Sequence, residues 1–320
     1  MSRPEYKIAF FGTPEFSVPA LEILSFIPNM KTVAVFTQPD KPIGKKKIVT
    51  PPPIKIAAKK LKLPVFQPEK LNNQTFINQL QDLHLDVCLV VAYGKIIPDT
   101  ALAIPRFGWL NIHPSLLPKY RGASPIQQAI LDGKLQSGVT LMKLDKGLDT
   151  GPIIIQWSCT INSDETAATL HDKLSQHGAQ LISDNLYNYF QGELKPIAQD
   201  NNQATITKII DKQDGRIDWN KPADYIERQL RAYTPWPGTF CYWSPAANKP
   251  KYRLKIISFI VSEKKALLKP GQTYADVNHI LVGTGRGNLE ILSVQLEGKK
   301  PLPVNDFILG YQNLKQTQLE

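Results

Sequence analysis

The sequence predicts an α/β protein in which a doubly wound, mostly parallel sheet is followed by a small C-terminal β-barrel. Apolar runs typical of strands buried on both faces alternate with amphipathic helices up to residue 190. A polar stretch broken by glycine and proline follows. Short strands separated by turn residues then continue to the end, which is typical of a small barrel. We therefore expect an N-terminal domain over residues 1–190, a linker over 191–207 and a C-terminal barrel over 208–320.

The N-terminal elements alternate in order along the chain. Apolar runs predict strands, whereas amphipathic runs opened by proline, asparagine or serine predict helices, because these residues suit the first turn of a helix. The expected strands are 6–13, 32–38, 64–68, 86–94, 108–113, 137–145 and 152–161, and the expected helices are 14–26, 51–63, 72–84, 124–134 and 164–190. This alternation is the reason for expecting a parallel sheet covered by helices.

The C-terminal part contains short strands and a single predicted helix over residues 223–231. The expected strands are 238–243, 252–261, 278–285 and 289–296. The sequence GTGRG (283–287) superficially suggests a phosphate-binding loop, but a second strand follows it instead of a helix. A hairpin turn is therefore the preferred interpretation of this stretch.

The composition fits an ordinary cytoplasmic protein. The chain is 42% hydrophobic and 21% charged, and its 320 residues are more than one core usually spans. Three widely separated cysteines argue against both a disulfide framework and a zinc site, so no metal is implied. The N-terminus has no long apolar core typical of a signal peptide, and no apolar run approaches the ~20 residues of a membrane span.

The positive charge is unevenly placed. The net charge is +10, and the segment from Lys41 to Lys62 contains eight lysines and no acidic residue. Residues 209–320 carry 16 basic and 11 acidic side chains, which is half of the excess in about a third of the chain. Such an excess indicates a polyanionic partner, with nucleic acid first in line. The alternative is a surface that merely keeps the protein soluble.

Three polar residues are predicted to meet at one edge of the sheet. Asn111 and His113 end a buried strand, and alternate residues of a strand point to the same side. Asp149 follows a later strand, and ligands of open α/β sheets bind beyond the carboxyl ends of the strands. The simpler alternative is that Asn111 caps a turn and His113 is an ordinary loop histidine.

These side chains suit attack on a carbonyl group. An imidazole exchanges protons near neutral pH, and a neighbouring carboxylate would favour its charged form and fix its orientation. An amide can donate to an oxygen that gains negative charge. No serine or cysteine with a paired base stands out, so we expect the substrate to bring its own nucleophile.

Several motifs resemble those of the methionyl-tRNA formyltransferase family. The central ones are shared by a wider group of enzymes that use 10-formyltetrahydrofolate, whereas TQPD and the last motif favour the tRNA enzymes. The resemblance covers nearly the whole chain and rests on FGTPEF (11–16), TQPDKP (37–42), VVAYGKIIP (90–98), NIHPSLLPKYRGASPIQ (111–127), GLDTG (147–151) and RAYTPWPGTF (231–240).

The resemblance implies a Rossmann-like formyltransferase domain, an OB-fold-like barrel that binds tRNA, and the roles of individual residues. Asn111, His113 and Asp149 fall on the catalytic trio of the family. The lysine-rich loop after Asp40 corresponds to a loop of the family that meets the acceptor end of tRNA. Lys45 stands where the family usually has arginine. The implied folate-binding residues are Ser115, Leu116, Leu117, Pro118, Ala92, Tyr93, Gly94 and Ile96, and the implied tRNA-binding residues are Lys45, Lys46 and Lys47.

The activity implied by the resemblance is transfer of a formyl group from 10-formyltetrahydrofolate to the methionine of initiator methionyl-tRNA, by a monomer without a metal. Two alternatives stay open at this point. One is a folate-dependent formyltransferase or hydrolase that acts on a small nucleotide or sugar amine. The other is a non-catalytic RNA-binding protein on a degenerate enzyme fold, against which the intact trio speaks.

Overall fold

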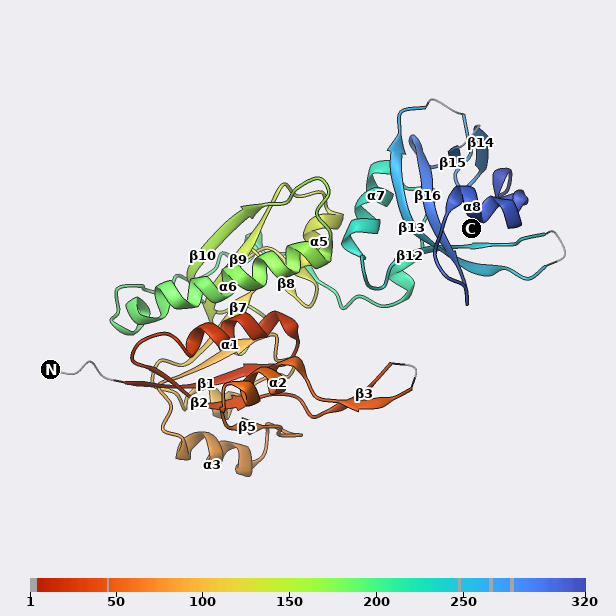
Figure 1. Ribbon diagram of the computed structural model, residues 1–320. Coiled ribbons are helices and arrows are strands. Elements are labelled where there is room, and N and C mark those ends of the chain that lie inside the picture. Colours follow the sequence, from red (N-terminus) through yellow and green to blue (C-terminus); the bar gives the residue numbers. More distant parts are fainter. Residues whose placement is uncertain (1–4, 45, 247–248, 265–266, 277–278) are drawn as a thin grey trace. The chain divides into compact units, whose positions relative to one another are not determined.

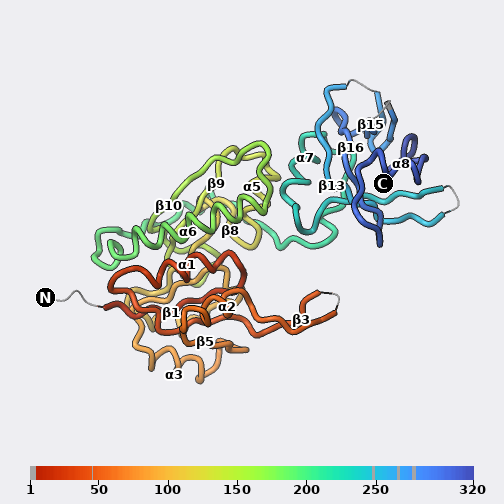
Figure 2. The backbone as a smooth tube through the Cα atoms, in the orientation of Figure 1, coloured from red at the N-terminus to blue at the C-terminus, as the bar shows by residue number. Residues whose placement is uncertain are grey.

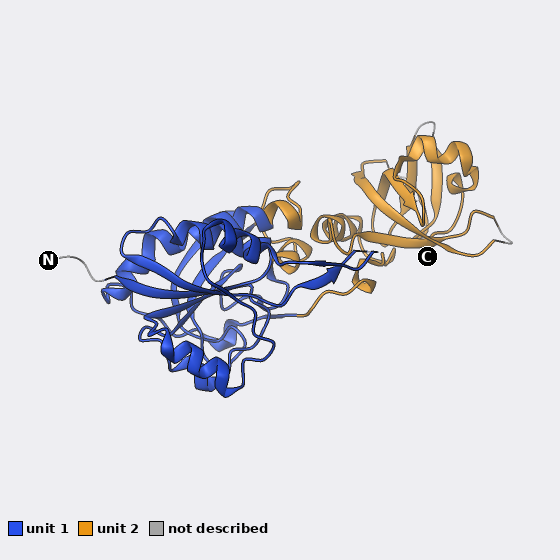
Figure 3. Ribbon diagram, turned by 60° about the horizontal axis from the view of Figure 1, so that its bottom comes forward, with its two compact units in different colours: residues 1–125, 136–160, 171–207 blue, residues 126–135, 161–170, 208–320 orange. Residues whose placement is uncertain are grey.

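The computed structural model describes residues 5–44, 46–246, 249–264, 267–276 and 279–320, and Figure 1 shows the ribbon. The chain divides into two compact units, which Figure 3 shows in blue and orange. The first contains residues 1–125, 136–160 and 171–207, and the second contains residues 126–135, 161–170 and 208–320. Within the described residues, none of the helices combines the length and the apolar character that crossing a bilayer requires.

A seven-stranded sheet forms the centre of the first unit, as the sequence predicts. The strands lie in the order β10-β9-β7-β6-β1-β2-β5. The pairs from β7 to β5 are parallel, whereas β9 runs antiparallel to both β7 and β10. The strand bounds are β1 Tyr6–Gly12, β2 Met30–Phe36, β5 Val65–Phe66, β6 Val87–Val91, β7 Trp109–His113, β9 Gln136–Lys143 and β10 Ile153–Thr160.

Helices alternate with these strands. The α3 helix begins where the Asn73 side chain accepts a hydrogen bond from the Phe76 amide, so asparagine caps this helix as predicted. The last helix is long and begins three residues later than expected, after Thr166. The helix bounds are α1 Val18–Leu24, α2 Pro53–Lys60, α3 Gln74–Asp82, α4 Asp99–Leu102, α5 Pro125–Leu131 and α6 Ala167–Phe190.

The two faces of strand β7 have different neighbours. Trp109 belongs to a buried cluster that also contains Phe76 of α3 and Ala101 of α4, and its indole donates a hydrogen bond to the Ala101 carbonyl (2.8 Å). Ile112, three residues later, faces the opposite side, where Gly178 of α6 approaches it. Alternation along the strand therefore places Asn111 and His113 on the same face as Trp109.

Residues 191–207, which the sequence predicts to be a linker, are packed on the first unit. Ile197 forms a β-bridge with Ile153 at the start of β10. The short strand β11 (Ile206–Thr207) pairs in parallel with β8 (Arg121–Gly122). The smooth tube in Figure 2 follows this segment along the first unit. The polar side chains of residues 191–207 form hydrogen bonds to loops, so this segment is not a free linker.

The second unit is built around an antiparallel sheet in the order β12-β13-β16-β15-β14. Its core contains Trp243, while Trp236 is about half exposed. Strand β14 and helix α8 are additions to the predicted elements. The bounds are α7 Ala223–Ala232, β12 Thr239–Trp243, β13 Tyr252–Ser262, β14 Thr273–Asp276, β15 His279–Gly283, β16 Asn288–Leu296, β17 Leu302–Pro303 and α8 Val304–Gly310.

The last residues of the chain connect the two edges of this sheet. Thr317 accepts a hydrogen bond from the Thr273 amide at the start of β14, and Leu319 donates to the Gly271 carbonyl (2.9 and 2.8 Å). Glu320 then exchanges two backbone hydrogen bonds with Tyr242 of β12 (2.7 and 3.0 Å). Residues 317–320 therefore join β14 to β12 and close the sheet into a barrel.

Candidate active site

Asn111 and His113 lie side by side at the carboxyl end of β7. Asn111 is opposite Val90 of the parallel strand β6 and Met142 of the antiparallel strand β9. His113 is opposite Thr140 of β9. The two residues are 9% and 4% exposed, so both are largely buried. Both residues belong to strand β7, the strand whose end the sequence predicts them to form.

The His113 ring lies between the Tyr120 carbonyl and the Asp149 carboxylate. Its Nε2 lies 2.8 Å from the Tyr120 carbonyl oxygen, which can only accept, so Nε2 carries a proton. Its Nδ1 lies 3.5 Å from Oδ2 of Asp149. A carboxylate facing Nδ1 stabilises the positive charge that the ring carries after taking up a second proton. The ring can therefore accept a proton during a reaction without being reoriented.

Asp149 is brought to His113 by a tight loop after β9. Its φ of +54° lies in the left-handed region that L-residues disfavour. The same Oδ2 accepts a hydrogen bond from the Gly122 amide (2.8 Å). Gly122 itself has a φ of +100°, and a Cβ there would lie 2.7 Å from the Thr207 carbonyl oxygen. The pairing of His113 with Asp149 thus depends on three chain segments.

The loop after β7 has a fixed shape. The Ser115 hydroxyl donates to the Lys119 carbonyl (2.7 Å), and the Thr140 hydroxyl donates to the Ser115 carbonyl (2.6 Å). The Leu117 amide donates to the Thr140 hydroxyl (3.2 Å), and the Leu117–Pro118 peptide is cis. Ser115 and Leu117 are buried, whereas Leu116 and Pro118 are half-buried.

The loop after β6 presents mainly its backbone. Ala92 and Gly94 are exposed and have φ of +51° and +77°. The Tyr93 side chain is only 1% exposed and packs edge-on against Phe11, so Tyr93 offers a ligand no side-chain surface. Burial raises the pKa of the Tyr93 hydroxyl above its usual value. Ile96 is 93% exposed and presents an apolar side chain beyond the strand end.

Lys46 and Lys47, two of the three predicted tRNA-binding lysines, lie in the turn of a short exposed hairpin. Strands β3 (Lys41–Ile43) and β4 (Ile48–Thr50) pair in antiparallel fashion, and Figure 1 shows the hairpin extending from the sheet. Lys46 and Lys47 are exposed, while Lys45 lies outside the described residues. Ile43, Ile48 and Val49 are also largely exposed, so the hairpin is apolar as well as basic.

The base of this hairpin is tied to the sheet by a polar network. The Lys55 ammonium lies 2.8 Å from the Asp40 carboxylate, and its hydrogen bond lowers the pKa of that carboxyl group. The Gln67 amide donates to both Asp40 (2.7 Å) and the Gln38 carbonyl (2.8 Å). The sequence singles out TQPD as a motif, and the structure gives its aspartate a role in fixing the start of β3.

The described part of the chain shows neither a metal-ligand cluster nor a reactive buried thiol. No cluster of three metal-ligating side chains occurs there. Cys88 and Cys241 are buried, and burial raises the pKa of both thiols. A thiol that stays protonated is a poor nucleophile, so these cysteines are structural.

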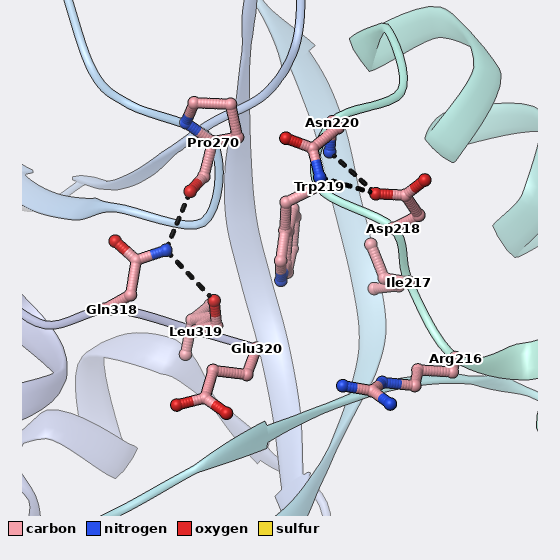
Figure 4. Close-up of a pocket in the computed structure, with 9 residues that line it drawn as sticks. All are labelled: Arg216, Ile217, Asp218, Trp219, Asn220, Pro270, Gln318, Leu319 and Glu320. Carbon is pink, nitrogen blue, oxygen red and sulfur yellow. Dashed lines mark hydrogen bonds between the residues drawn. The ribbon is translucent and has the colours of Figure 1, made fainter.

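A pocket of about 350 Å³ lies within the second unit, where Figure 4 shows the Trp219 ring at its centre. The Gln318 amide closes one wall by donating to the Pro270 and Leu319 carbonyls (2.7 and 3.2 Å). None of the predicted site residues lines it. Its walls join residues 216–220 to the segment that closes the barrel, so it is a feature of that barrel.

Two residues near Asp149 were not identifiable from the sequence. Gln199 donates to the loop that carries Asp149, and the buried Arg121 donates to Gln199. Gln199 lies in a stretch with the composition of a linker, and Arg121 resembles any other basic residue after strand β7. Neither gives a signal in a single sequence.

Comparison with known proteins finds matching family models and full-length relatives. A family model described as formyl transferase matches residues 6–186, and one described as formyl transferase, C-terminal domain, matches residues 209–312. Methionyl-tRNA formyltransferase of Chloroflexus aurantiacus is 42% identical over 306 residues, which cover 95% of this chain and 96% of that protein. The protein of the same name from Staphylococcus aureus is 39% identical over 310 residues, covering 96% and 97%.

Solved structures share the fold at lower identity. WlaRD, a sugar 3N-formyl transferase solved in the presence of dTDP and 5-N-formyl-THF, matches with a TM-score of 0.65 and 21% identity, over 93% of this chain and all of that one. HypX from Aquifex aeolicus in complex with tetrahydrofolic acid matches with a TM-score of 0.60 and 15% identity, over 96% of this chain and 47% of that one. Given the matched domains and the close full-length relatives, the chain belongs to the methionyl-tRNA formyltransferase family.

Proposed function

We propose that this protein transfers the formyl group of 10-formyltetrahydrofolate to the α-amino group of methionine on initiator tRNA, giving N-formylmethionyl-tRNA for translation initiation. The observation that carries the proposal is the His113 ring held between the Tyr120 carbonyl and the Asp149 carboxylate, beside Asn111 on the same strand. The full-length relatives are named methionyl-tRNA formyltransferase, and this name is the reason for choosing methionyl-tRNA as the formyl acceptor.

The site residues fit the bond changes of this reaction. The methionine nitrogen forms a bond to the formyl carbon, and the bond from that carbon to N10 of the folate breaks. In between, the formyl oxygen carries negative charge, which the Asn111 amide is suited to stabilise by donating a hydrogen bond. His113 accepts the proton that the amine loses and returns it to N10, while Asp149 stabilises the charged ring.

The loops beyond the strands supply the binding surfaces. The loops after β6 and β7 suit a flat, partly apolar ring system with amide edges, which describes the pterin of folate. They offer the exposed backbone of Ala92 and Gly94, the side chain of Ile96 and the loop Ser115–Pro118. The positive charges of Lys46 and Lys47 suit the phosphates at the acceptor end of tRNA. Lys45 precedes them in the sequence and follows Gly44. The barrel would supply further contacts to the tRNA.

A formylation assay tests the proposal. Methionyl initiator tRNA and 10-formyltetrahydrofolate should give formylmethionyl-tRNA, whereas uncharged tRNA should give no product. An amino sugar nucleotide serves as the competing acceptor. Formylation of the sugar amine but not of the charged tRNA would replace this proposal by the small-molecule alternative. We further propose that the protein acts as a cytoplasmic monomer, because charged tRNA is a cytoplasmic substrate and one chain carries the whole trio.

A further inference from the structure

The loop that carries Asp149 is fastened by a side chain 50 residues further along the chain. The Gln199 amide nitrogen donates to the Asp149 carbonyl (2.9 Å) and to the Gly151 carbonyl (2.7 Å). These carbonyls lie on either side of Thr150. The two N–H groups of one amide therefore hold the turn that directs the Asp149 carboxylate towards His113.

This turn needs such support because its backbone is unfavourable. Asp149 adopts the left-handed conformation, which a non-glycine residue keeps only where surrounding contacts impose it. Gly151 is so close to the end of β9 that a Cβ would lie 1.8 Å from the Lys143 carbonyl oxygen. Without the two hydrogen bonds from Gln199, the Asp149 backbone would be free to relax towards a commoner conformation.

The orientation of the Gln199 amide is fixed by Arg121. Its Oε1 accepts hydrogen bonds from Nε and Nη2 of Arg121 (3.1 and 2.8 Å). A guanidinium has only donors, so the amide oxygen must face Arg121 and the amide nitrogen must face the loop. Arg121 is 6% exposed and is held further by the Asn201 side-chain oxygen (2.9 Å).

The same chain segment also holds the partner of the Asp149 carboxylate. The Arg121 amide donates to the Thr205 carbonyl (2.8 Å), and the Thr207 hydroxyl donates to the Arg121 carbonyl (3.0 Å). These contacts place the next residue, Gly122, whose amide binds the Asp149 carboxylate. Residues 199–207 therefore fix both the backbone and the side chain of Asp149.

We propose that Gln199 is a positioning residue for formyl transfer, and that it acts by holding Asp149 against His113. The inference rests on the proposed function, because that function supplies the reaction whose rate Gln199 is expected to affect. Gln199 itself faces the loop carbonyls and Arg121, so it positions the trio without touching the reacting atoms.

The test uses the full-length Gln199→Glu variant. Glutamate keeps an acceptor for Arg121 but has no N–H for the two loop carbonyls, so it removes the fastening and keeps a charged partner for the buried guanidinium. We expect kcat for formylation to fall about 10- to 100-fold, as for a displaced catalytic group. The KM values for folate and charged tRNA should stay within about threefold, because the binding loops are unchanged.

A matched control and a second variant strengthen this test. Gln203→Glu introduces the same charge at an exposed position of the same segment and should leave kcat at the parental value. Thermal unfolding shows whether each variant is folded. If Gln199→Glu is not, Gln199→Ala takes its place, since it removes the donors without adding charge.

A spectroscopic measurement separates this inference from the proposed function. The ¹⁵N signals of the His113 ring, identified by their loss in His113→Gln, should shift in Gln199→Glu and not in Gln203→Glu. In an Asp149→Asn background, Gln199→Glu should cause almost no further shift, because its effect passes through Asp149. Parental kcat in Gln199→Glu, unchanged ring signals, or a full further shift in the Asp149→Asn background would each overturn the inference. A parent that formylates no charged tRNA would overturn the proposed function alone.

Discussion

At the scale of single residues, the site combines one feature that follows from strand geometry with others that do not. Asn111 and His113 are adjacent because a strand repeats every second residue, and that placement was predictable. Asp149 could be assigned only to the same edge of the sheet. Its left-handed backbone, the Tyr120 carbonyl behind His113 and the Gln199 contacts depend on residues far apart in sequence, which a single sequence does not link.

The Asn111→Ala variant tests the oxyanion role. The substitution removes the amide that is suited to the formyl oxygen, so we expect turnover to fall about 10²- to 10³-fold with little change in the thermal unfolding midpoint. Asn78→Ala, on α3 and away from the site, is the control and should leave turnover unchanged. Turnover of Asn111→Ala within threefold of the parent would rule out this role.

The Asp149→Asn variant tests the charge that faces His113. Asparagine keeps the shape and tolerates a positive φ, but it cannot stabilise a charged ring. We expect a loss of at least about 100-fold in kcat at neutral pH, measured by formylation of charged tRNA. Asp172→Asn removes an exposed carboxylate that lies 2.9 Å from His171, and should leave kcat unchanged. Equal effects of the two substitutions would contradict the special role of Asp149.

At the scale of elements, prediction from the sequence was most accurate for long periodic segments. The seven strands of the first sheet and the cap of α3 follow directly from apolar runs and from Asn73. Strand β14 and helix α8 were not predicted. The segment 191–207 is polar because its side chains bond to loops, and composition alone cannot distinguish this from a free linker.

The lysine hairpin is expected to act as a phosphate-binding element. Changing Lys45, Lys46 and Lys47 to alanine should weaken tRNA binding and flatten the slope of log K against log salt by about 0.9 for each phosphate that is no longer bound. Folate binding should not change. The control replaces Lys59, Lys60 and Lys62 with alanine, which removes the same charge near the end of α2. Lys45→Arg should keep or improve activity, because guanidinium adds donors at equal charge.

The closing segment of the barrel is expected to contribute to stability. Leu319 is buried in the second core, so Leu319→Ala should lower the free energy of unfolding by about 2–5 kcal/mol in a denaturant titration. Leu309 is largely exposed, and Leu309→Ala is the matched control with an expected change near zero. Equal stability of the two variants would show that residues 317–320 only rest on a barrel that is already closed.

At the scale of the whole molecule, the charge of +10 should govern association with tRNA. If the hairpin and the barrel together neutralise at least three phosphates, the slope of log K against log salt should be steeper than about −2.7. Equilibrium binding of charged tRNA between low and physiological salt measures this slope. Binding of folate is the internal control and should depend little on salt. A slope near zero would mean that the basic surface serves solubility.

The closure of the barrel by residues 317–320 also sets an order of events during synthesis. Strand β12 forms two backbone hydrogen bonds with Glu320, almost eighty positions later, so its free edge stays open until the ribosome has made residue 320. The first unit has no such dependence, because residue 207 completes its set of strands. A nascent chain can therefore bring Asn111, His113 and Asp149 together while the barrel still exposes an unpaired edge, which is the feature that chaperones and proteases recognise.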